Sequence, residues 1–352
     1  MKYFIITKKH IQILIFTVIL LIFMFIFINI AKYVMQREFT PANILKEQLP
    51  DEDDVSISKK ILGFSKDSPE SILIAYSASF PEKNKDEAPV VNKTDENVMP
   101  TPTPQKIEEK SIKGKGEIKN QTGYNVNINE FLSIKPEISQ NPTVLIVHTH
   151  TTESYTPDGD NMYFINDNSR STDEGKNMIA IGDTISSILT KEGISVIHDK
   201  TFHDYPAYSG AYGRSLKTIE KNIKAYPDID IVLDVHRDAV ISTEGTATKM
   251  VCDIADKKTA QIMLVVGTDG GGLKHPDWRK NLAFAANIQN QADTVYPGLM
   301  RPLNLRDERF NQHLTPNSII VEVGTNANTM TEAKLGAEYV AKCLVNVIKN
   351  NS

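Results

Sequence analysis

The sequence has few of the residues that mark several common classes of protein. Only two of its 352 residues are cysteine, Cys252 and Cys343, and they form no CxxC pair. A disulfide framework is therefore not indicated. Two buried thiols are expected, with a single bridge between them as the alternative. The net charge is −5 and no basic block is present, so nucleic acid is not an expected partner. No internal repeat is evident, and the length suits one or two globular domains.

Charge is also missing from a long stretch near the N-terminus. Residues 11–31 carry no charged side chain, and basic residues flank them on both sides. As a helix, this stretch spans the roughly 30 Å hydrocarbon core of a bilayer. A cleaved signal peptide is the competing interpretation, but its apolar region is only about 7–15 residues long and ends in a small-x-small site, which is missing here. We therefore predict a retained transmembrane anchor.

The charges around this anchor predict its orientation. More positive charge precedes residues 11–31 than follows them, which favours a cytoplasmic segment at residues 1–10 and an exported body. The expected location is the cell membrane, as a single-pass protein with the rest of the chain on the outer side.

Two segments of low apolar content follow the anchor. Residues 32–80 form a juxtamembrane segment with one short apolar run, 71–76, that suits a lone helix. Residues 81–140 are dominated by Lys, Glu, Asn, Thr and Pro and contain few large apolar residues. Such a stretch buries too little apolar area to offset its ordering entropy, so a disordered low-complexity linker is predicted. The expected catalytic domain is residues 141–352.

Strand and helix patterns alternate through that domain. Strands are predicted at residues 143–148, 194–198, 229–235, 250–254, 262–266 and 318–323, and helices at 174–192, 212–225, 278–296 and 331–348. This alternation predicts an α/β fold with a mixed, mostly parallel sheet and helices on both faces. The carboxyl ends of the strands in such a sheet converge on one crevice, where ligands bind.

Ionisable residues gather at three of these strands. They are His148, His150 and Glu153 after the first strand, His236, Arg237 and Asp238 at the end of a central strand, and Glu322 within the last strand. Two histidines and a glutamate leave a zinc ion one open position for water, as in catalytic sites. A nearby carboxylate can then move a proton from that water to a leaving amine. Glu322 is the candidate for this role, because a carboxylate among β-branched residues is costly unless it is paired or functional. A buried ion pair is the alternative.

These motifs resemble those of stage II sporulation protein P, a family of membrane-anchored peptidoglycan hydrolases of endospore-forming bacteria. The likeness rests on HTHTTESY at 148–155, DVHRD at 234–238 and IVEVG at 320–324, and it covers about residues 140–350. The resemblance implies an amidase-like fold and bound Zn²⁺, as in the zinc-dependent N-acetylmuramoyl-L-alanine amidases. It implies cleavage of the amide between N-acetylmuramic acid and L-alanine, and of peptide cross-links, during engulfment in sporulation. It also implies peptidoglycan as substrate and stage II sporulation proteins D and M as partners.

The resemblance assigns roles to individual residues. His150 and His236 match the zinc-binding histidines of the amidases, and Glu322 matches their catalytic glutamate. The remaining ligand departs from the amidase pattern. Those enzymes use a glutamate at the start of the next helix, near Glu174 here, whereas the opening motif offers Glu153 in the His-x-x-Glu spacing of zinc carboxypeptidases. We favour Glu153 and keep Glu174 as the alternative.

Two further residues have expected supporting roles. His148 is expected on the same side of an extended strand as His150, as an outer partner or a substitute ligand. Arg237 has the planar donor group that suits a stem-peptide carboxylate, with a salt bridge to Asp238 as the alternative.

Two asparagines follow the expected catalytic glutamate. Asn326 and Asn328 lie near the asparagine that follows the catalytic glutamate in the amidases. Two other functions stay open. One is a zinc peptidase that acts only on stem peptides, and the other is a catalytically silent scaffold that binds peptidoglycan.

Overall fold

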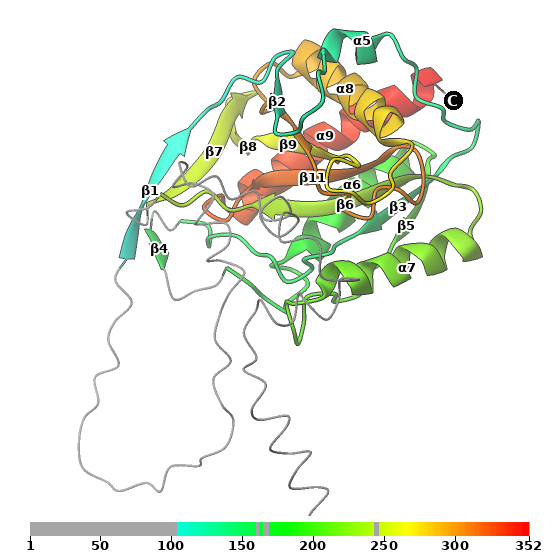
Figure 1. Ribbon diagram of the computed structural model, residues 1–352. Helices are drawn as coiled ribbons and strands as arrows, with labels where there is room; N and C mark the ends of the chain where they lie inside the picture. The colour runs from blue at the N-terminus through cyan, green and yellow to red at the C-terminus, as the bar shows by residue number, and fades with distance from the viewer. Residues whose placement is uncertain (1–103, 160–161, 165–168, 243–245, 352) are drawn as a thin grey trace, which may run out of the picture. The chain divides into compact units, whose positions relative to one another are not determined.

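The structure is a computed structural model that describes most of the chain after residue 103 (Figure 1). The described residues are 104–159, 162–164, 169–242 and 246–351. The predicted anchor at 11–31 and the juxtamembrane segment at 32–80 lie outside them. Within the described part of the chain, none of the helices combines the length and the apolar character needed to cross a membrane.

A seven-stranded sheet forms the centre of the fold. Its strands lie in the order β2 (Ile118–Asn120), β10 (Leu303–Arg306), β9 (Ile262–Gly267), β11 (Ser318–Thr325), β6 (Ile229–Asp238), β3 (Thr143–Val147) and β5 (Ser195–His198). Five of the six neighbouring pairs are parallel, and only β11 and β9 run antiparallel. The mixed α/β fold predicted from the alternation of strands and helices is confirmed.

Helices cover both faces of this sheet, as Figure 1 shows with α8 above it and α7 below. The helices of the described part are α5 (Ile128–Leu132), α6 (Met178–Lys191), α7 (Ala211–Ala225), α8 (Trp278–Val295) and α9 (Met330–Asn351). Side chains alternate across β3, so Val144 and Ile146 pack with α6, α8 and α9, whereas Leu145 and Val147 pack against α7.

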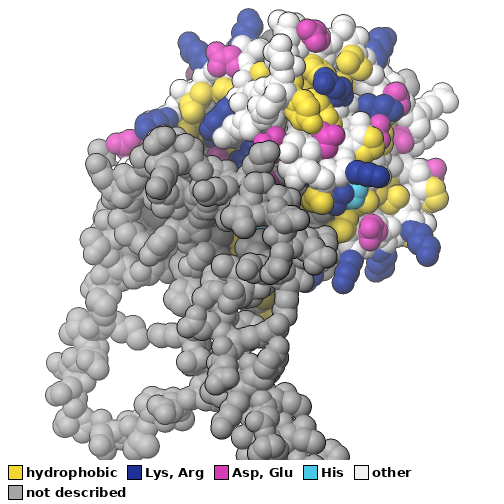
Figure 2. Space-filling model, viewed as in Figure 1, with side chains coloured by type: hydrophobic (Ala, Val, Ile, Leu, Met, Phe, Trp, Pro, Cys, Tyr) yellow, Lys and Arg dark blue, Asp and Glu magenta, His cyan; other side chains and the backbone are white. Residues whose placement is uncertain are grey.

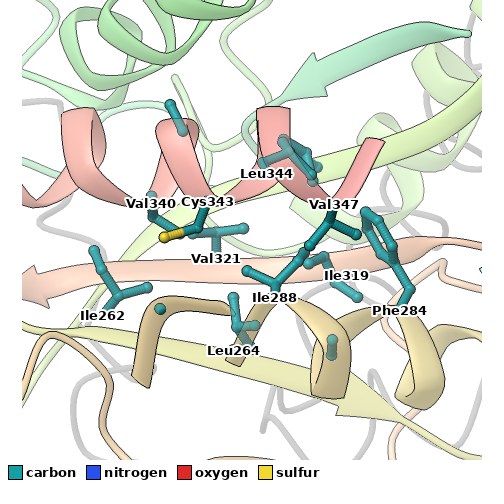
Figure 3. Close-up of a cluster of buried hydrophobic side chains, with 14 of the residues drawn as sticks. Ile262, Leu264, Phe284, Ile288, Ile319, Val321, Val340, Cys343, Leu344 and Val347 are labelled. Atoms are coloured by element: carbon teal, nitrogen blue, oxygen red, sulfur yellow. The ribbon is translucent and has the colours of Figure 1, made fainter. Parts of the chain in front are cut away.

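The main core lies between β9, β11 and the helices α8 and α9 (Figure 3). Leu264, Ile288, Val321 and Leu344 are at most 3% exposed and face one another across this layer. Each such side chain stabilises the fold by about 1.5–3 kcal/mol relative to an exposed position. Cys343 is buried in the same cluster and Cys252 is half-buried, and both thiols are free.

The predicted linker at 81–140 is wrong from residue 104 onward, because β1, β2 and α5 lie within it. β1 (Pro104–Lys110) belongs to a second, four-stranded sheet in the order β4 (Met162–Phe164), β1, β7 (Ala247–Ile254) and β8 (Lys257–Ala260). β1 runs parallel to β7, and β2 runs parallel to β10. β2 lies at the edge of its sheet and β1 lies between β4 and β7, and main-chain hydrogen bonds to neighbouring strands hold both, so few apolar side chains are needed. Composition alone therefore hides them.

The helix predicted at 174–192 begins later, at Met178. The side chain of Asn177 accepts a hydrogen bond from Ile179 N and caps the helix. Its other end is as expected, because Gly193 adopts a left-handed φ of 84° and Ile194 N donates to Leu189 O. Glu174 therefore lies in the turn before the helix rather than in its first turn.

On the face of the described domain shown in Figure 2, Lys and Arg side chains are interspersed with Asp and Glu. This face presents no broad area of a single charge sign.

Candidate metal centre

Three parallel neighbours bring the predicted site residues to one end of the sheet. β6 lies between β3 and β11, and Glu322 of β11 pairs in register with His236 of β6. The segment that carries His150 and Glu153 follows β3 directly. Register partners on parallel strands project to the same face. The strand pairing thus places residues from three distant parts of the sequence side by side.

His150, Glu153 and His236 form a cluster whose ligand atoms all lie within 4.8 Å of one another. Nδ1 of His150 is 3.4 Å from Oε1 of Glu153, and Nδ1 of His236 is 3.5 Å from Oε2. Two ligands at about 2.0–2.1 Å from a tetrahedral zinc ion lie roughly 3.3 Å apart. The spacing and the chemistry of this donor set therefore fit zinc.

Glu153 is held in its ionised form. Burial by itself would raise its pKa, but hydrogen bonds with His150 and His236 and the charge of Arg237 hold the pKa well below the usual range. Arg237 N also donates to its Oε2 at 3.2 Å. Glu174, in contrast, is exposed and lies outside the cluster. The structure thus brings Glu153, and not Glu174, to the two histidines.

Asp234 orients His236 from the side opposite Glu153. Its Oδ1 lies 2.8 Å from His236 Nε2, although that nitrogen has no hydrogen-bond partner of good geometry among the described residues. Thr149 fixes the carboxylate, with its N at 2.7 Å and its Oγ1 at 2.6 Å. Such outer carboxylates set the orientation of metal-binding histidines. The D-x-H spacing in the sequence could have indicated this contact, because residues two apart on a strand lie on the same face.

Asp234→Asn is expected to weaken zinc binding by about 10- to 100-fold, since the histidine loses the partner that orients it. Competition with a chromogenic chelator measures the affinity. Asp230→Asn is the matched control, because Asp230 lies on the same strand, where its carboxylate accepts a hydrogen bond from Ser139 N. An equal loss in both variants would contradict the role of Asp234.

His148 does not join the cluster, and the expectation that it shares a side with His150 is wrong. β3 ends at Val147, so the alternation of an extended strand no longer holds in the turn that follows. The buried ring of His148 contacts Val235 O at 2.9 Å and His198 Nε2 at 2.8 Å. Burial lowers its pKa to about 3, so the ring is neutral. His148 therefore has a structural role, because its ring connects the end of β3 with β5 and β6.

Arg237 forms hydrogen bonds with the backbone of the segment that carries Glu153 and with Ser169. Its Nε donates to Ser154 O and its Nη2 to Ser169 O, each at 2.9 Å, and the residue is buried. The guanidinium is therefore not available to grip a stem-peptide carboxylate. The alternative salt bridge with Asp238 is also absent from the described interactions, because the Asp238 carboxylate pairs with Arg301 at 2.8 Å.

Two aromatic side chains that were not predicted from the sequence lie against the cluster of His150, Glu153 and His236. The ring of Tyr208 stacks on His150 at a centroid distance of 4.7 Å, and Tyr212 meets the same ring edge-on at 5.6 Å. The guanidinium of Arg170 lies 4.6 Å from the Tyr208 ring and 3.7 Å from Glu153 Oε1. These residues come from α7 and from turns, whose position relative to a strand end no local pattern reveals.

Glu322 lies beside the donor cluster as a carboxyl group without a partner. Its side chain is partly exposed, yet Oε2 is buried and has no hydrogen-bond partner in the described part of the chain. Burial, with a further contribution from the charge of Asp238, raises its pKa to about 8. A carboxyl group with such a pKa can both accept and release a proton near neutral pH.

The raised pKa predicts how the stability of the metal-free protein depends on pH. Between the usual value of 4.5 and about 8, the folded protein keeps a proton on Glu322 that the unfolded chain has lost. Glu322 therefore stabilises the folded protein fully below pH 4.5. This contribution to the free energy of unfolding is lost as the pH rises through 8. Glu322→Gln removes this dependence. Melting curves of both proteins between pH 5 and 9 should converge at low pH and separate at high pH, with the variant more stable; parallel curves would contradict the assignment.

These features define a mixed α/β protein in which a histidine–glutamate–histidine cluster that could hold a metal ion lies at the carboxyl ends of the strands. The model of the family Stage II sporulation protein P (SpoIIP) matches residues 44–345. The chain belongs to this family, as the motifs of the sequence predicted.

The chain is also similar to a curated relative and, more distantly, to several solved structures. Stage II sporulation protein P of Bacillus subtilis (strain 168) is 25% identical over 264 residues, which cover 70% of this chain and 62% of the relative. The match thus spans less than two thirds of that relative's length. Among solved structures, the amidase AmiC2 of Nostoc punctiforme is 12% identical with a TM-score of 0.35, over 60% of this chain and 97% of its own. The CwlD amidase of Clostridioides difficile, in complex with the GerS lipoprotein, is 14% identical with a TM-score of 0.37, over 60% and 98%.

Proposed function

We propose that this chain is a zinc-dependent N-acetylmuramoyl-L-alanine amidase that cleaves peptidoglycan during engulfment in sporulation. Membership of the family supports a cell-wall hydrolase of sporulation. The observation that carries the amidase proposal is the convergence of His150, Glu153 and His236 within 4.8 Å, with the unpartnered carboxyl of Glu322 beside them.

The chemistry follows from these positions. Zinc held by the three donors would supply a Lewis acid for water and for the carbonyl of the scissile amide. The carboxylate of Glu322 takes a proton from the attacking water while the water oxygen bonds to the carbonyl carbon. The same group then gives that proton to the amide nitrogen as the carbon–nitrogen bond breaks. The products are the carboxyl group of the muramic acid and the free amino group of L-alanine.

A zinc carboxypeptidase that acts on stem peptides fits less well. That reaction needs a cationic group for the free carboxylate of its substrate. Arg237 is engaged with the backbone of the Glu153 segment, and Arg214 donates to His203 O and Ala207 O. Neither of these two arginines is available. Cleavage within cross-linked peptides needs no such group and stays part of the proposal.

Mass spectrometry of purified sacculi digested with the zinc-loaded full chain in detergent tests the reaction. New amino groups on L-alanine together with peptide-free glycan are expected for the amidase. Cuts within the peptides and none at the muramoyl amide would favour the peptidase. An absence of products from protein that retains zinc would favour the scaffold and overturn the proposal.

We further propose that residues 11–31 anchor the chain in the cell membrane with residues 1–10 in the cytoplasm, and that it acts with stage II sporulation proteins D and M. The charge asymmetry around the apolar stretch supports the orientation. Protease added to intact protoplasts should digest the domain that contains the metal centre. Full protection that is lost only on lysis would contradict the orientation.

A further inference from the structure

Arg170 places an unused N–H group beside the candidate metal centre. Its Nη2 lies 3.7 Å from Glu153 Oε1, beyond hydrogen-bond distance, and donates no hydrogen bond within the described part of the chain. Its Nη1, in contrast, donates to Thr152 Oγ1 at 3.0 Å and to the carboxylate of Asp204. Only one of the two terminal nitrogens is therefore used to hold the side chain in place.

The backbone sets Arg170 on the same face as Glu153. The two residues lie opposite each other in an isolated antiparallel bridge, and beside it Ser171 N donates to Thr152 O at 2.7 Å. Residues directly opposite each other on antiparallel strands project to the same face. Local backbone pairing thus directs the guanidinium toward the carboxylate of Glu153.

Two further contacts fix the guanidinium before any substrate binds. The side chain of Asp204 is fully buried, and besides Arg170 it accepts hydrogen bonds from N and Oγ1 of Thr152 at 3.1 and 2.6 Å. The ring of Tyr208 lies against the guanidinium, with its centroid 4.6 Å from Cζ. A donor that is fixed in advance needs no reorganisation during the reaction, which is the property of an oxyanion-binding group.

Arg170 also lies on the accessible side of the cluster. The side chains of Glu153 and His236 are only 8% and 4% exposed. Those of His150 and Arg170 are more open, at 13% and 27%. Both of these contact the ring of Tyr208, which is itself exposed. A substrate that approaches the cluster past these exposed groups meets the unused N–H of Arg170.

The charges around the guanidinium indicate what it binds. Asp204 already balances its positive charge, and Glu153 adds a second carboxylate nearby, so a third permanently charged carboxylate is disfavoured here. A carbonyl oxygen is neutral when it binds and becomes negative only during the reaction. We propose that Arg170 is a catalytic residue that donates from Nη2 to the carbonyl oxygen of the scissile amide. This inference rests on the proposed function.

The role of Arg170 follows from the movement of electrons in the reaction. As the water oxygen bonds to the carbonyl carbon and Glu322 takes the proton, one electron pair of the C=O bond moves onto the carbonyl oxygen. The N–H of Arg170 binds this negative oxygen more strongly than the neutral one, so the transition state is stabilised more than the bound substrate. The pair returns when the carbon–nitrogen bond breaks and Glu322 protonates the nitrogen. Arg170 keeps its own protons throughout.

Arg170→Lys tests this role in the zinc-loaded full chain in detergent. Lysine keeps the positive charge beside Asp204 but has no second nitrogen. The change should lower kcat for the muramoyl amide by about 10²- to 10³-fold, the usual loss for one such donor, with KM and zinc content nearly unchanged. Arg279→Lys is the matched control, because Arg279 is exposed and lies over the Trp278 ring, much as Arg170 lies over Tyr208. It should keep the parent kcat.

Binding separates this role from recognition of the intact substrate. The probe is a phosphinate analogue of N-acetylmuramoyl-L-alanine, with P(=O)(O⁻)–CH₂ in place of the scissile C(=O)–NH, titrated calorimetrically. Arg170→Lys should weaken its binding by the same factor as it lowers kcat/KM, as expected for a transition-state mimic. Binding of N-acetylmuramoyl-L-alanyl-D-isoglutamine to the chain carrying Glu322→Gln, which slows turnover, should hardly change when Arg170→Lys is added.

Several results would overturn the assignment of Arg170. Equal weakening of the phosphinate and the muropeptide would show that it binds the ground state, and a loss of zinc along with kcat would show a structural role. A selective loss for the D-glutamate counterpart of the muropeptide would show recognition of a carboxylate. If the parent cuts the muramoyl amide and Arg170→Lys does so equally fast, the inference fails and the proposed function stands. If the parent cuts only peptide bonds, the proposed function fails, and a kcat loss of the same size at those bonds still supports Arg170.

Discussion

Glu322→Gln is expected to lower kcat by about 10²- to 10⁴-fold, the usual contribution of a general acid–base group, without a loss of bound zinc. The carboxamide has almost the same shape as the carboxyl but neither takes a proton from water nor gives one to a leaving amine. The unpartnered Oε2 and the pKa of about 8 give the parent residue both abilities near neutral pH. Rates of amine release from a soluble muropeptide, together with zinc content by atomic emission, measure the two effects separately.

Glu338→Gln is the control for this experiment, because Glu338 lies on α9, where it pairs with Lys342. Turnover by Glu322→Gln at the parent rate would show that another group moves the proton. A loss of zinc along with turnover would instead place Glu322 among the ligands.

Glu153→Gln is expected to release zinc almost completely, with an affinity loss of more than about 100-fold, beyond that of an outer partner. The substitution replaces a charged ligand with a weak neutral one between His150 and His236. It also removes the negative charge that these two rings contact at 3.4 and 3.5 Å. Zinc bound per chain after dialysis, followed by restoration of activity with added zinc in the parent only, measures the loss.

Glu174→Gln is the matched control, since the sequence motifs left both glutamates as candidates. It should keep one zinc ion per chain and the parent activity, because Glu174 is exposed in the turn before α6. The opposite result, with zinc lost in Glu174→Gln and kept in Glu153→Gln, would require the turn before α6 to move to the strand ends when metal binds.

The sequence predicted most of the sheet and the position of three candidate site residues for one reason. Apolar runs of strand length that end in His150, His236 and near Glu322 are local patterns, and their meaning depends only on the rule that parallel strands end at a common edge. The linker at 81–140 was predicted wrongly from residue 104 because main-chain pairing of β1 and β2 with distant strands leaves almost no trace in composition.

The choice between two glutamates and the contacts of Arg237 with the Glu153 segment needed the tertiary structure. Each depends on how a turn or a distant strand packs against β6, and such packing is set by contacts between residues far apart in the sequence. By itself, the sequence predicted a metal site at the strand ends and named His150 and His236 as its histidines, since strand periodicity is local, and the structure brings these two residues into one cluster. Only the tertiary structure decided which of the two glutamates lies against these histidines, because that follows from burial and long-range packing.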